Sequence, residues 1–223
     1  MDQPGLSERE HGSALNGLRR VNWWSRSSVI LWPSIQKLAH TVDQRPLRIL
    51  DIASGGGDVA LDIAIRAQRA GIAVEVDGCD ISPYAVKHAS DLAERMQLDQ
   101  VQFYERDILQ EPVDKQYDVV MCSLFLHHLE ETQAVKLFSI MSQATRHLVL
   151  VNDLRRSRVG YWLAWAGCRL LTRSPIVHTD GPLSVAGAFT MDEAAGLAEQ
   201  GGLSGFQMTR RWPQRWLLEW SRT

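Results

Sequence analysis

Residues 47–60 constrain the fold of this chain more than any other part of its sequence. They read LRILDIASGGGDVA, an apolar run that passes into three consecutive glycines and then into helical spacing. Glycines let a backbone approach a ligand closely and adopt positive φ, and the start of a helix offers unpaired N–H groups. The segment therefore predicts a buried strand, a ligand-binding loop and a helix.

Strand and helix patterns alternate along the rest of the central sequence. The run at 117–123 is apolar at its centre, as expected for a strand that is covered on both faces. Parallel strands joined by right-handed helical crossovers form a sheet with helices on both faces. The predicted fold class is therefore α/β, a Rossmann-like parallel sheet. We expect strands at 47–52, 73–79, 101–106, 117–123 and 147–152, and helices at 58–70, 83–96 and 132–144.

The C-terminal third shows a different pattern. An amphipathic helix is expected at 156–172, a loop at 173–188, and a helix at 191–200 that Thr190 caps and two glycines end. Residues 206–212 and 215–221 then predict an antiparallel hairpin that closes the sheet.

The expected domain organisation has two parts. Residues 1–42 form an N-terminal tail and cap helices, and Pro33 is expected to break the helical pattern of residues 13–41 into two pieces. Residues 43–223 form the main domain, with a substrate-side insertion at about 154–190.

Composition excludes several classes of protein. A formal net charge of -2 disfavours nucleic acid as a partner, because domains that bind phosphates are usually strongly basic. The three cysteines form no CxxC pair, and no His and carboxylate cluster has metal-ligand spacing, so no metal is expected. The N-terminus has no apolar core and no apolar stretch is long enough to cross a bilayer, which makes the cytoplasm the expected location.

Acidic residues stand at the ends of three predicted strands. Asp51 follows the first, Asp80 the second and Asp107 the third. Ligands bind at the carboxyl ends of parallel strands, where Asp80 could accept from both hydroxyls of a ribose and Asp107 from an adenine amino group. The glycines alone also satisfy the dinucleotide fingerprint, but an acid beside a pyrophosphate would be unfavourable. Asp51 instead suits a cationic ligand. Asp58 is explained equally well as a helix cap.

At this point the chain resembles the class I S-adenosylmethionine-dependent methyltransferases, and among them the ubiquinone/menaquinone-type small-molecule branch. The family motif D/E-x-G-x-G-x-G corresponds to Asp51-x-Ala53-x-Gly55-x-Gly57, with alanine in place of the first glycine. The resemblance covers residues 45–152 well and the remainder more loosely. It implies S-adenosyl-L-methionine as cofactor, with the methionine portion at Asp51, Ala53, Ser54, Gly55 and Gly57, the ribose at Asp80, the adenine at Asp107 and Ile108, and the methionine and substrate side at Ser123 and Phe125. Ile81, next to Asp80, is a further expected cofactor contact.

Candidate catalytic residues lie near the ends of the fourth and fifth strands. Neighbouring residues point in different directions, so we expect only one of His127 and His128 to reach the pocket, and we favour His128. Asp153 could orient a base or substrate, and a turn role explains it equally well. His178 is a second candidate base in the loop at 173–188, with a packed or solvated loop histidine as the alternative.

An arginine- and tryptophan-rich segment follows the fifth strand. Residues 153–165 are interpreted first as an amphipathic helix whose aromatic face packs on the sheet. The alternatives are a lid over an aromatic or lipophilic acceptor and a helix on a membrane surface. A second wall is expected from the N-terminal helix, where Arg20 or Asn22 could contact the cofactor carboxylate or the acceptor.

The predicted function is transfer of a methyl group to a small acceptor, with O-methylation of a hydroxylated aromatic, quinol or polyketide-like compound favoured. Methyl transfer from a sulfonium mainly requires alignment of the reacting atoms, so motifs identify the cofactor better than the acceptor. Two alternatives remain open, a non-catalytic S-adenosylmethionine-binding relative and an NAD-binding oxidoreductase.

Overall fold

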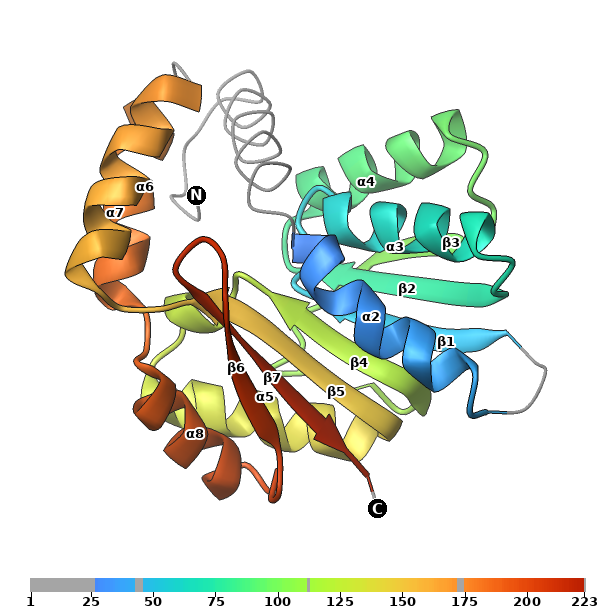
Figure 1. Ribbon diagram of the computed structural model, residues 1–223. Coiled ribbons are helices and arrows are strands. Elements are labelled where there is room, and N and C mark those ends of the chain that lie inside the picture. Colours follow the sequence, from blue (N-terminus) through green and yellow to red (C-terminus); the bar gives the residue numbers. More distant parts are fainter. Residues whose placement is uncertain (1–26, 43–45, 112, 172–174, 223) are drawn as a thin grey trace.

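The computed structural model describes residues 27–42, 46–111, 113–171 and 175–222 (Figure 1). Seven strands form one sheet in the order β3-β2-β1-β4-β5-β7-β6. They are β1 (Leu47–Ile52), β2 (Val74–Asp80), β3 (Val101–Glu105), β4 (Tyr117–Ser123), β5 (Thr145–Leu154), β6 (Gln207–Arg211) and β7 (Arg215–Ser221). The helical elements are α2 (Ser27–Ala39), α3 (Asp58–Arg69), α4 (Pro83–Arg95), η1 (Leu126–His128), α5 (Glu131–Ala144), α6 (Arg158–Leu171), α7 (Pro175–Gly187) and α8 (Met191–Gln200).

The direction of the strands confirms the predicted α/β fold. Strands β1 to β5 pair in parallel, whereas β7 pairs antiparallel with both β5 and β6. The chain order reverses between β1 and β4, and a ligand crevice of an open parallel sheet lies at such a switch point. The candidate site is therefore expected at the carboxyl ends of β1 and β4.

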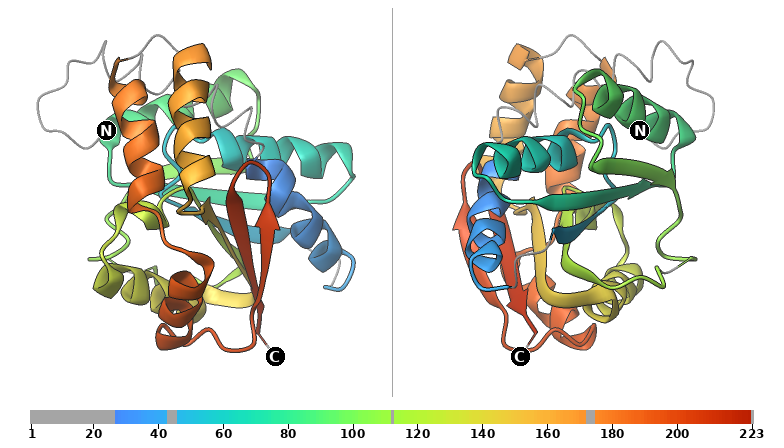
Figure 2. Two further views of the ribbon diagram at one scale, coloured as in Figure 1. Left: turned by 60° about the vertical axis from the view of Figure 1, so that its left-hand side comes forward. Right: turned by 90° about the vertical axis from the view of Figure 1, so that its right-hand side faces the viewer.

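Helices cover the sheet on both faces (Figure 2). On one face, Leu31 and Ile35 of α2 and the small residues Ala60 and Ala64 of α3 are fully buried against β1 and β4. On the other face, α5 and α8 bury a second core that contains Phe138 and the β7 residue Trp216. Small side chains on α3 let the helix lie close to the sheet beneath the glycine loop.

The predicted break at Pro33 is wrong. Pro33 lies inside α2, a continuous helix over Ser27–Ala39. A proline in a helix interior removes one hydrogen bond and costs about 3 kcal/mol. Leu31 and Ile35, on either side of it, are fully buried. We infer that their packing on the sheet offsets that cost.

The predicted loop at 173–188 is also wrong, because α7 spans Pro175–Gly187. A Gly-Pro dipeptide such as Gly181-Pro182 ordinarily interrupts a helix, but α7 continues through it and packs along α6. A Cβ on Gly181 would lie 2.4 Å from the Cys168 sulfur, and one on Gly160 would lie 3.2 Å from Val185. Small residues at these crossings let the two helices approach closely, and their contact maintains the helix. The pair α6–α7 stands beyond the carboxyl end of β5 (Figure 1).

Several expectations fall on residues 1–26, which lie outside the described residues. These are the N-terminal tail, the first part of the 13–41 helix and the roles of Arg20 and Asn22. Within the described part of the chain, no helix is both long and apolar enough to cross a membrane.

Gly196, inside α8, and Gly201, which caps the C-terminal end of α8, give a matched test of the packing. A Cβ on Gly201 would lie 2.4 Å from Cβ of Phe138, whereas one on Gly196 meets nothing within 4 Å. We expect Gly201→Ala to lower the free energy of unfolding by about 1–3 kcal/mol through overpacking. Gly196→Ala should instead raise it by up to about 1 kcal/mol through helix propensity. Urea unfolding of both variants measures the difference, and equal effects would contradict the described α5–α8 contact.

Candidate active site

The glycine loop follows β1 and leads into α3. Ala53, Gly55 and Gly57 all have positive φ, at 55°, 53° and 80°. The loop is fixed to the neighbouring strand, because Ser54 N–H donates to the Cys79 carbonyl at 2.9 Å and Gly55 N–H donates to an Asp80 oxygen at 2.8 Å. A Cβ on Gly55 would meet nothing within 4 Å, so the backbone there is open to a ligand. The structure thus has the strand, glycine loop and helix that the sequence predicted, and ligand binding by the loop stays a prediction.

Asp51 is a buried acid at the base of this loop. Only 2% of the residue is exposed, and its Oδ2 atom has no hydrogen-bond partner. Burial, together with the charge of Asp80, raises the pKa of Asp51 to about 8, although a hydrogen bond from the Ala60 backbone opposes this shift. An unpaired buried carboxyl is costly unless a cation or donor approaches it. Asp51 therefore fits a ligand with a positively charged group, such as the ammonium of S-adenosylmethionine.

The other acids lie at the next two strand ends, as predicted. Asp80 accepts hydrogen bonds from the backbones of Gly55 and Ser82, which places its carboxylate between the glycine loop and the start of α4. Asp107 accepts from Leu109 N–H at 3.0 Å. Ile81 is 62% exposed beside Asp80, whereas Ile108 is buried. An exposed apolar side chain next to a carboxylate suits a nucleoside, and the individual cofactor contacts remain predictions.

The ends of β4 and β5 are joined by a polar network. Asn152 donates to the Ser123 hydroxyl at 3.0 Å, and Leu124 N–H donates to the Asn152 carbonyl at 2.9 Å. Asn152 is fully buried, yet its side-chain oxygen has no partner. Phe125 is partly buried and caps η1. A second unsatisfied buried atom thus lies at the strand ends where the predicted substrate side begins.

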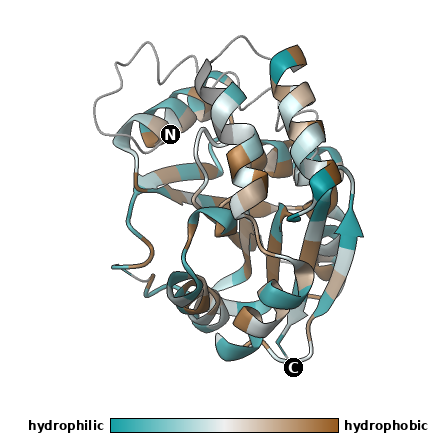
Figure 3. Cartoon of the chain, turned by 90° about the vertical axis from the view of Figure 1, so that its left-hand side faces the viewer, coloured by the Kyte–Doolittle hydropathy of each residue, from teal (hydrophilic) through white to brown (hydrophobic). Residues whose placement is uncertain are grey.

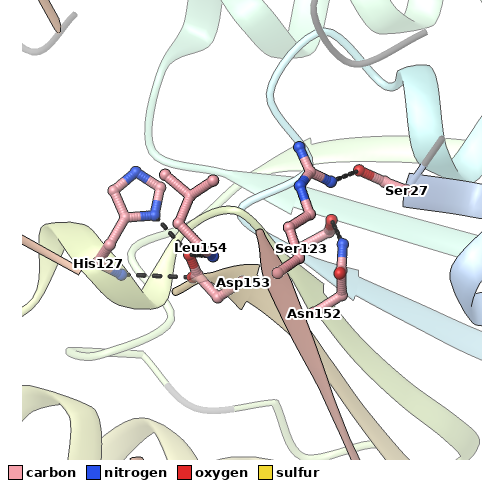
Figure 4. A network of polar contacts seen from close by, with 7 residues as sticks. Ser27, Ser123, His127, Asn152, Asp153 and Leu154 are labelled. Atoms are coloured by element: carbon pink, nitrogen blue, oxygen red, sulfur yellow. Dashed lines mark hydrogen bonds and ion pairs between the residues drawn. The ribbon is translucent and has the colours of Figure 1, made fainter. Parts of the chain in front are cut away.

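The structure pairs Asp153 with His127 (Figure 4). Nδ1 of His127 lies 2.6 Å from an Asp153 oxygen, and both side chains are almost fully buried, at 5% and 2% exposure. The other Asp153 oxygen accepts from His127 N–H at 3.3 Å. This arrangement fixes the orientation of the imidazole ring and leaves Nε2 on the far side of the ring from the carboxylate.

A buried arginine lies on the other side of Asp153. Arg215 is 2% exposed, donates to the Ser27 hydroxyl at 2.7 Å and has an unpartnered Nε. Burial lowers the pKa of Arg215 to about 10, against the attraction of Asp153. Burial alone would raise the pKa of Asp153, but His127, the Leu154 N–H and Arg215 together lower it below its ordinary value. Asp153 is therefore ionised and holds a proton on Nδ1 of His127.

The two histidines favoured as bases from the sequence, His128 and His178, lie on different elements of the structure, η1 and α7. His128, which the sequence favoured over His127, is exposed on η1, whereas the His127 side chain is buried against Asp153. The choice of base between them stays a prediction. His178 lies on α7, roughly 13 Å along the helix axis from Gly187, where α7 meets His127. The structure does not bring His178 to Asp153. The sequence did not indicate that His127 and Arg215 lie on either side of Asp153, because both contacts depend on tertiary packing.

Within the described ranges, no three His, Cys, Asp or Glu side chains are grouped as ligands of a metal ion would be. That the protein uses no metal stays a prediction from the sequence.

The central sequence matches a known domain family. Residues 49–147 match the family described as "Methyltransferase domain". A demethylmenaquinone methyltransferase from Deinococcus radiodurans is 30% identical over 130 residues, which are 57% of this chain and 48% of the relative. Residues 49–147 are therefore a methyltransferase domain. The methyltransferase resemblance and the α/β fold class predicted from the sequence are confirmed.

Two further likenesses agree with this assignment. A ubiquinone biosynthesis O-methyltransferase from Rickettsia felis is 25% identical over 153 residues, 64% of this chain and 60% of the relative. The magnesium protoporphyrin IX methyltransferase of Synechocystis, solved with bound S-adenosylhomocysteine, shares the fold with a TM-score of 0.60 at 18% identity, over 93% of this chain and 84% of that one.

These likenesses limit what is established. The methyltransferase chain spans only 48% and 60% of the two curated relatives, so the substrate and activity of this protein are proposals. S-adenosyl-L-methionine, the cofactor predicted from the sequence, is confirmed as the cofactor of the family. The match to methyltransferases removes the support for the NAD-binding alternative.

Ala53 gives a test of the loop geometry. It has a positive φ of 55° at the first glycine position of the family motif. A residue with a Cβ in this region is strained by about 1–3 kcal/mol, which exceeds the entropic advantage of alanine in the unfolded chain. We expect Ala53→Gly to stabilise the fold by about 1 kcal/mol. Ala64→Gly, inside α3, should destabilise it by about the same amount. Denaturant unfolding measures both, and a loss of stability in Ala53→Gly would contradict the loop geometry.

Asp51 gives a test of the buried carboxyl. The pKa of Asp51 is about 8 in the folded state, whereas its ordinary value is 3.8. Between these two pH values the folded state holds a proton that the unfolded state has lost. Asp51 therefore destabilises the fold progressively as the pH rises from about 4 toward 8. We expect Asp51→Asn to raise the Tm at pH 8 and to weaken S-adenosylhomocysteine binding at least tenfold.

Asp118 is the matched control for that substitution. It is a fully buried acid at the other end of the sheet, and it accepts from Arg48 N–H at 2.9 Å. Asp118→Asn should lower the Tm and leave binding unchanged. Thermal melts measure the Tm of both variants, and calorimetric titration measures their affinity for S-adenosylhomocysteine. Binding by Asp51→Asn that is as tight as binding by the unmodified protein would contradict a cofactor role for Asp51.

Proposed function

We propose that this methyltransferase transfers the methyl group of S-adenosylmethionine to an oxygen of a small hydroxylated acceptor. The observation that carries the proposal is the buried pair of His127 and Asp153 at the carboxyl ends of β4 and β5. An oriented imidazole beside the predicted methionine side is suited to remove a proton from a hydroxyl group. A hydroxyl acceptor benefits from such a base, whereas an amine or thiolate has less need of one.

The cofactor would be held by the residues that the strand ends bring together. The unpaired oxygen of Asp51 would accept from the ammonium group, and the exposed backbone of the glycine loop would lie against the methionine portion. Asp80 would accept from the ribose, with Ile81 beside the base. When bound, S-adenosylmethionine supplies an activated methyl group on a sulfonium, whose leaving group is a neutral thioether.

The chain's own contribution to the reaction is alignment and proton removal. The ionised Asp153 holds the proton on Nδ1, so the lone pair of His127 is on Nε2. When the acceptor hydroxyl takes up the methyl group, its proton would pass to Nε2 of His127. The negative charge of Asp153 would stabilise the imidazole as it becomes protonated, and the positive charge of Arg215 would partly offset that effect.

The proposed acceptor is aromatic, a quinol or polyketide-like, and lipophilic. The names of the curated relatives refer to demethylmenaquinone and ubiquinone biosynthesis. In this chain, the largely apolar helices α6 and α7 stand beyond the end of β5, the strand that carries Asp153. Apolar walls beside a site favour flat, apolar ligands.

A non-catalytic relative that only binds S-adenosylmethionine is the second candidate. The intact acids at the strand ends support binding in either case. The buried His127–Asp153 pair favours an enzyme, because a protein that only binds the cofactor has no need of an oriented base. Turnover with any acceptor in a panel of phenols and quinols separates the two candidates.

His127 and His128 form a matched pair for testing the base. We expect His127→Ala to lower kcat about 100-fold or more on a phenolic acceptor, with little change in S-adenosylhomocysteine affinity. His128→Ala, at an exposed position, should retain most of the activity. The rate of His127→Ala should recover as the pH approaches about 10, where a phenol ionises without help. Rates are measured as methylated product by mass spectrometry.

Two results would contradict the assignment of the base. One is a His127→Ala variant that is fully active at pH 7. The other is a larger loss in His128→Ala than in His127→Ala. If no phenol or quinol is methylated by the unmodified protein while S-adenosylmethionine binds, the non-catalytic alternative replaces the proposal.

A further inference from the structure

Helix α6 has an apolar outer face that the rest of the described chain leaves uncovered. Its inner side is formed by small residues that face α7, among them Gly160 and Cys168. The opposite side carries large apolar residues, with Trp162 at 62% and Leu170 at 86% exposure. A folded protein rarely exposes so many large apolar side chains on one helix without a partner.

Four residues run in a line along this outer face. Arg158, Trp162, Trp165 and Arg169 follow one another at helical spacing, so they lie above each other on one side of α6. The rings of Trp162 and Trp165 are 5.9 Å apart, and the guanidinium carbon of Arg169 lies 4.2 Å from the centre of the Trp165 ring. We call this line of four residues the Arg–Trp stripe.

The charge of α6 is entirely positive. Its sequence, RVGYWLAWAGCRLL, contains two arginines and no acid, although the whole chain has a formal net charge of -2. Within the described residues, no carboxylate forms an ion pair with Arg158 or Arg169. The neighbouring Arg156 differs, because it pairs with Glu193. The two ends of the Arg–Trp stripe therefore carry positive charges that lack an acidic partner.

The chemistry of the stripe fits a lipid surface. Trp and Tyr have an apolar body and one polar atom, which suits the boundary between lipid headgroups and acyl chains. Arginines at both ends of the stripe can reach phosphates while the tryptophans enter the apolar layer. The helix also contains no Asn, Gln, Ser or Thr, the residues that would give directional hydrogen bonds to a protein partner. Figure 3 shows pale and brown segments along much of α6 and α7.

We propose that the outer face of α6 docks on the surface of an anionic lipid membrane. The helix would lie in the plane of the interface, with Trp162 and Trp165 inserted and Arg158 and Arg169 on lipid phosphates. Because α6 begins just after β5, docking would bring the edge of the sheet that carries Asp153 close to the bilayer. The inference goes beyond the proposed methyl transfer and does not depend on it.

The test is co-sedimentation of the full chain with vesicles. One set contains phosphatidylcholine alone and the other adds phosphatidylglycerol. We expect binding to the anionic vesicles, with a shift of tryptophan emission to shorter wavelength. The double variant Trp162→Ser/Trp165→Ser should bind at least tenfold more weakly. Arg158→Gln/Arg169→Gln should lose affinity for the anionic vesicles by about 30-fold, from about 1 kcal/mol for each arginine.

Two controls keep the outcome clear. Met96→Ser removes an exposed apolar side chain at the end of α4, away from α6, and should bind vesicles like the unmodified protein. Circular dichroism and S-adenosylhomocysteine binding show that each variant is folded. The proposal is overturned if the folded protein does not bind anionic vesicles, or if both double variants bind as tightly as the unmodified chain. It is also overturned if Trp162→Ser/Trp165→Ser only converts a dimer into a monomer.

Discussion

The buried carboxyl of Asp51 is the constraint on which the rest of the site depends. It sits at the end of β1, between two neighbouring parallel strands, with one oxygen unpaired and a pKa raised to about 8. A fold selected only for stability would replace this group or pair it. The backbone around Asp51 is held by the glycine loop, by the hydrogen bond from Gly55 N–H to Asp80 and by the close packing of α3. The site is thus arranged for a ligand that brings positive charge.

A second buried acid, Asp153, lies at the same carboxyl ends of the strands, but its environment lowers its pKa instead of raising it. Asp153 is as deeply buried as Asp51, but His127 and Arg215 hold its pKa below the ordinary value. Groups with pKa values pushed in opposite directions mark different roles in an active site. Asp51 can gain from a cationic cofactor, whereas Asp153 is already ionised and serves the imidazole. The first belongs to the proposed cofactor side and the second to the proposed acceptor side, and the switch point between β1 and β4 lies between them.

The sequence predicted the central fold because strong local patterns and tertiary packing agree there. Residues 47–60 form the predicted strand, loop and helix, and the three acids lie at or next to the ends of successive strands, as expected. The failures arose where packing opposes local signals. Pro33 continues α2 over a buried face, and α7 forms despite Gly181-Pro182 because it packs on α6. The choice between His127 and His128 depends on the direction of a short turn, and the approach of Arg215 to Asp153 depends on the pairing of β7 with β5. Neither can be read from spacing along the chain.

Proton release on cofactor binding is the most direct measure of whether Asp51 receives the cationic part of S-adenosylmethionine. Calorimetric titration of the cofactor at pH 7, in two buffers with different ionisation enthalpies, measures the protons exchanged on binding. Since a carboxyl with a pKa of about 8 is mostly protonated at pH 7, we expect release of somewhat less than one proton from the unmodified protein, and none from Asp51→Asn. Tight binding with no proton release, equal in the two proteins, would contradict it.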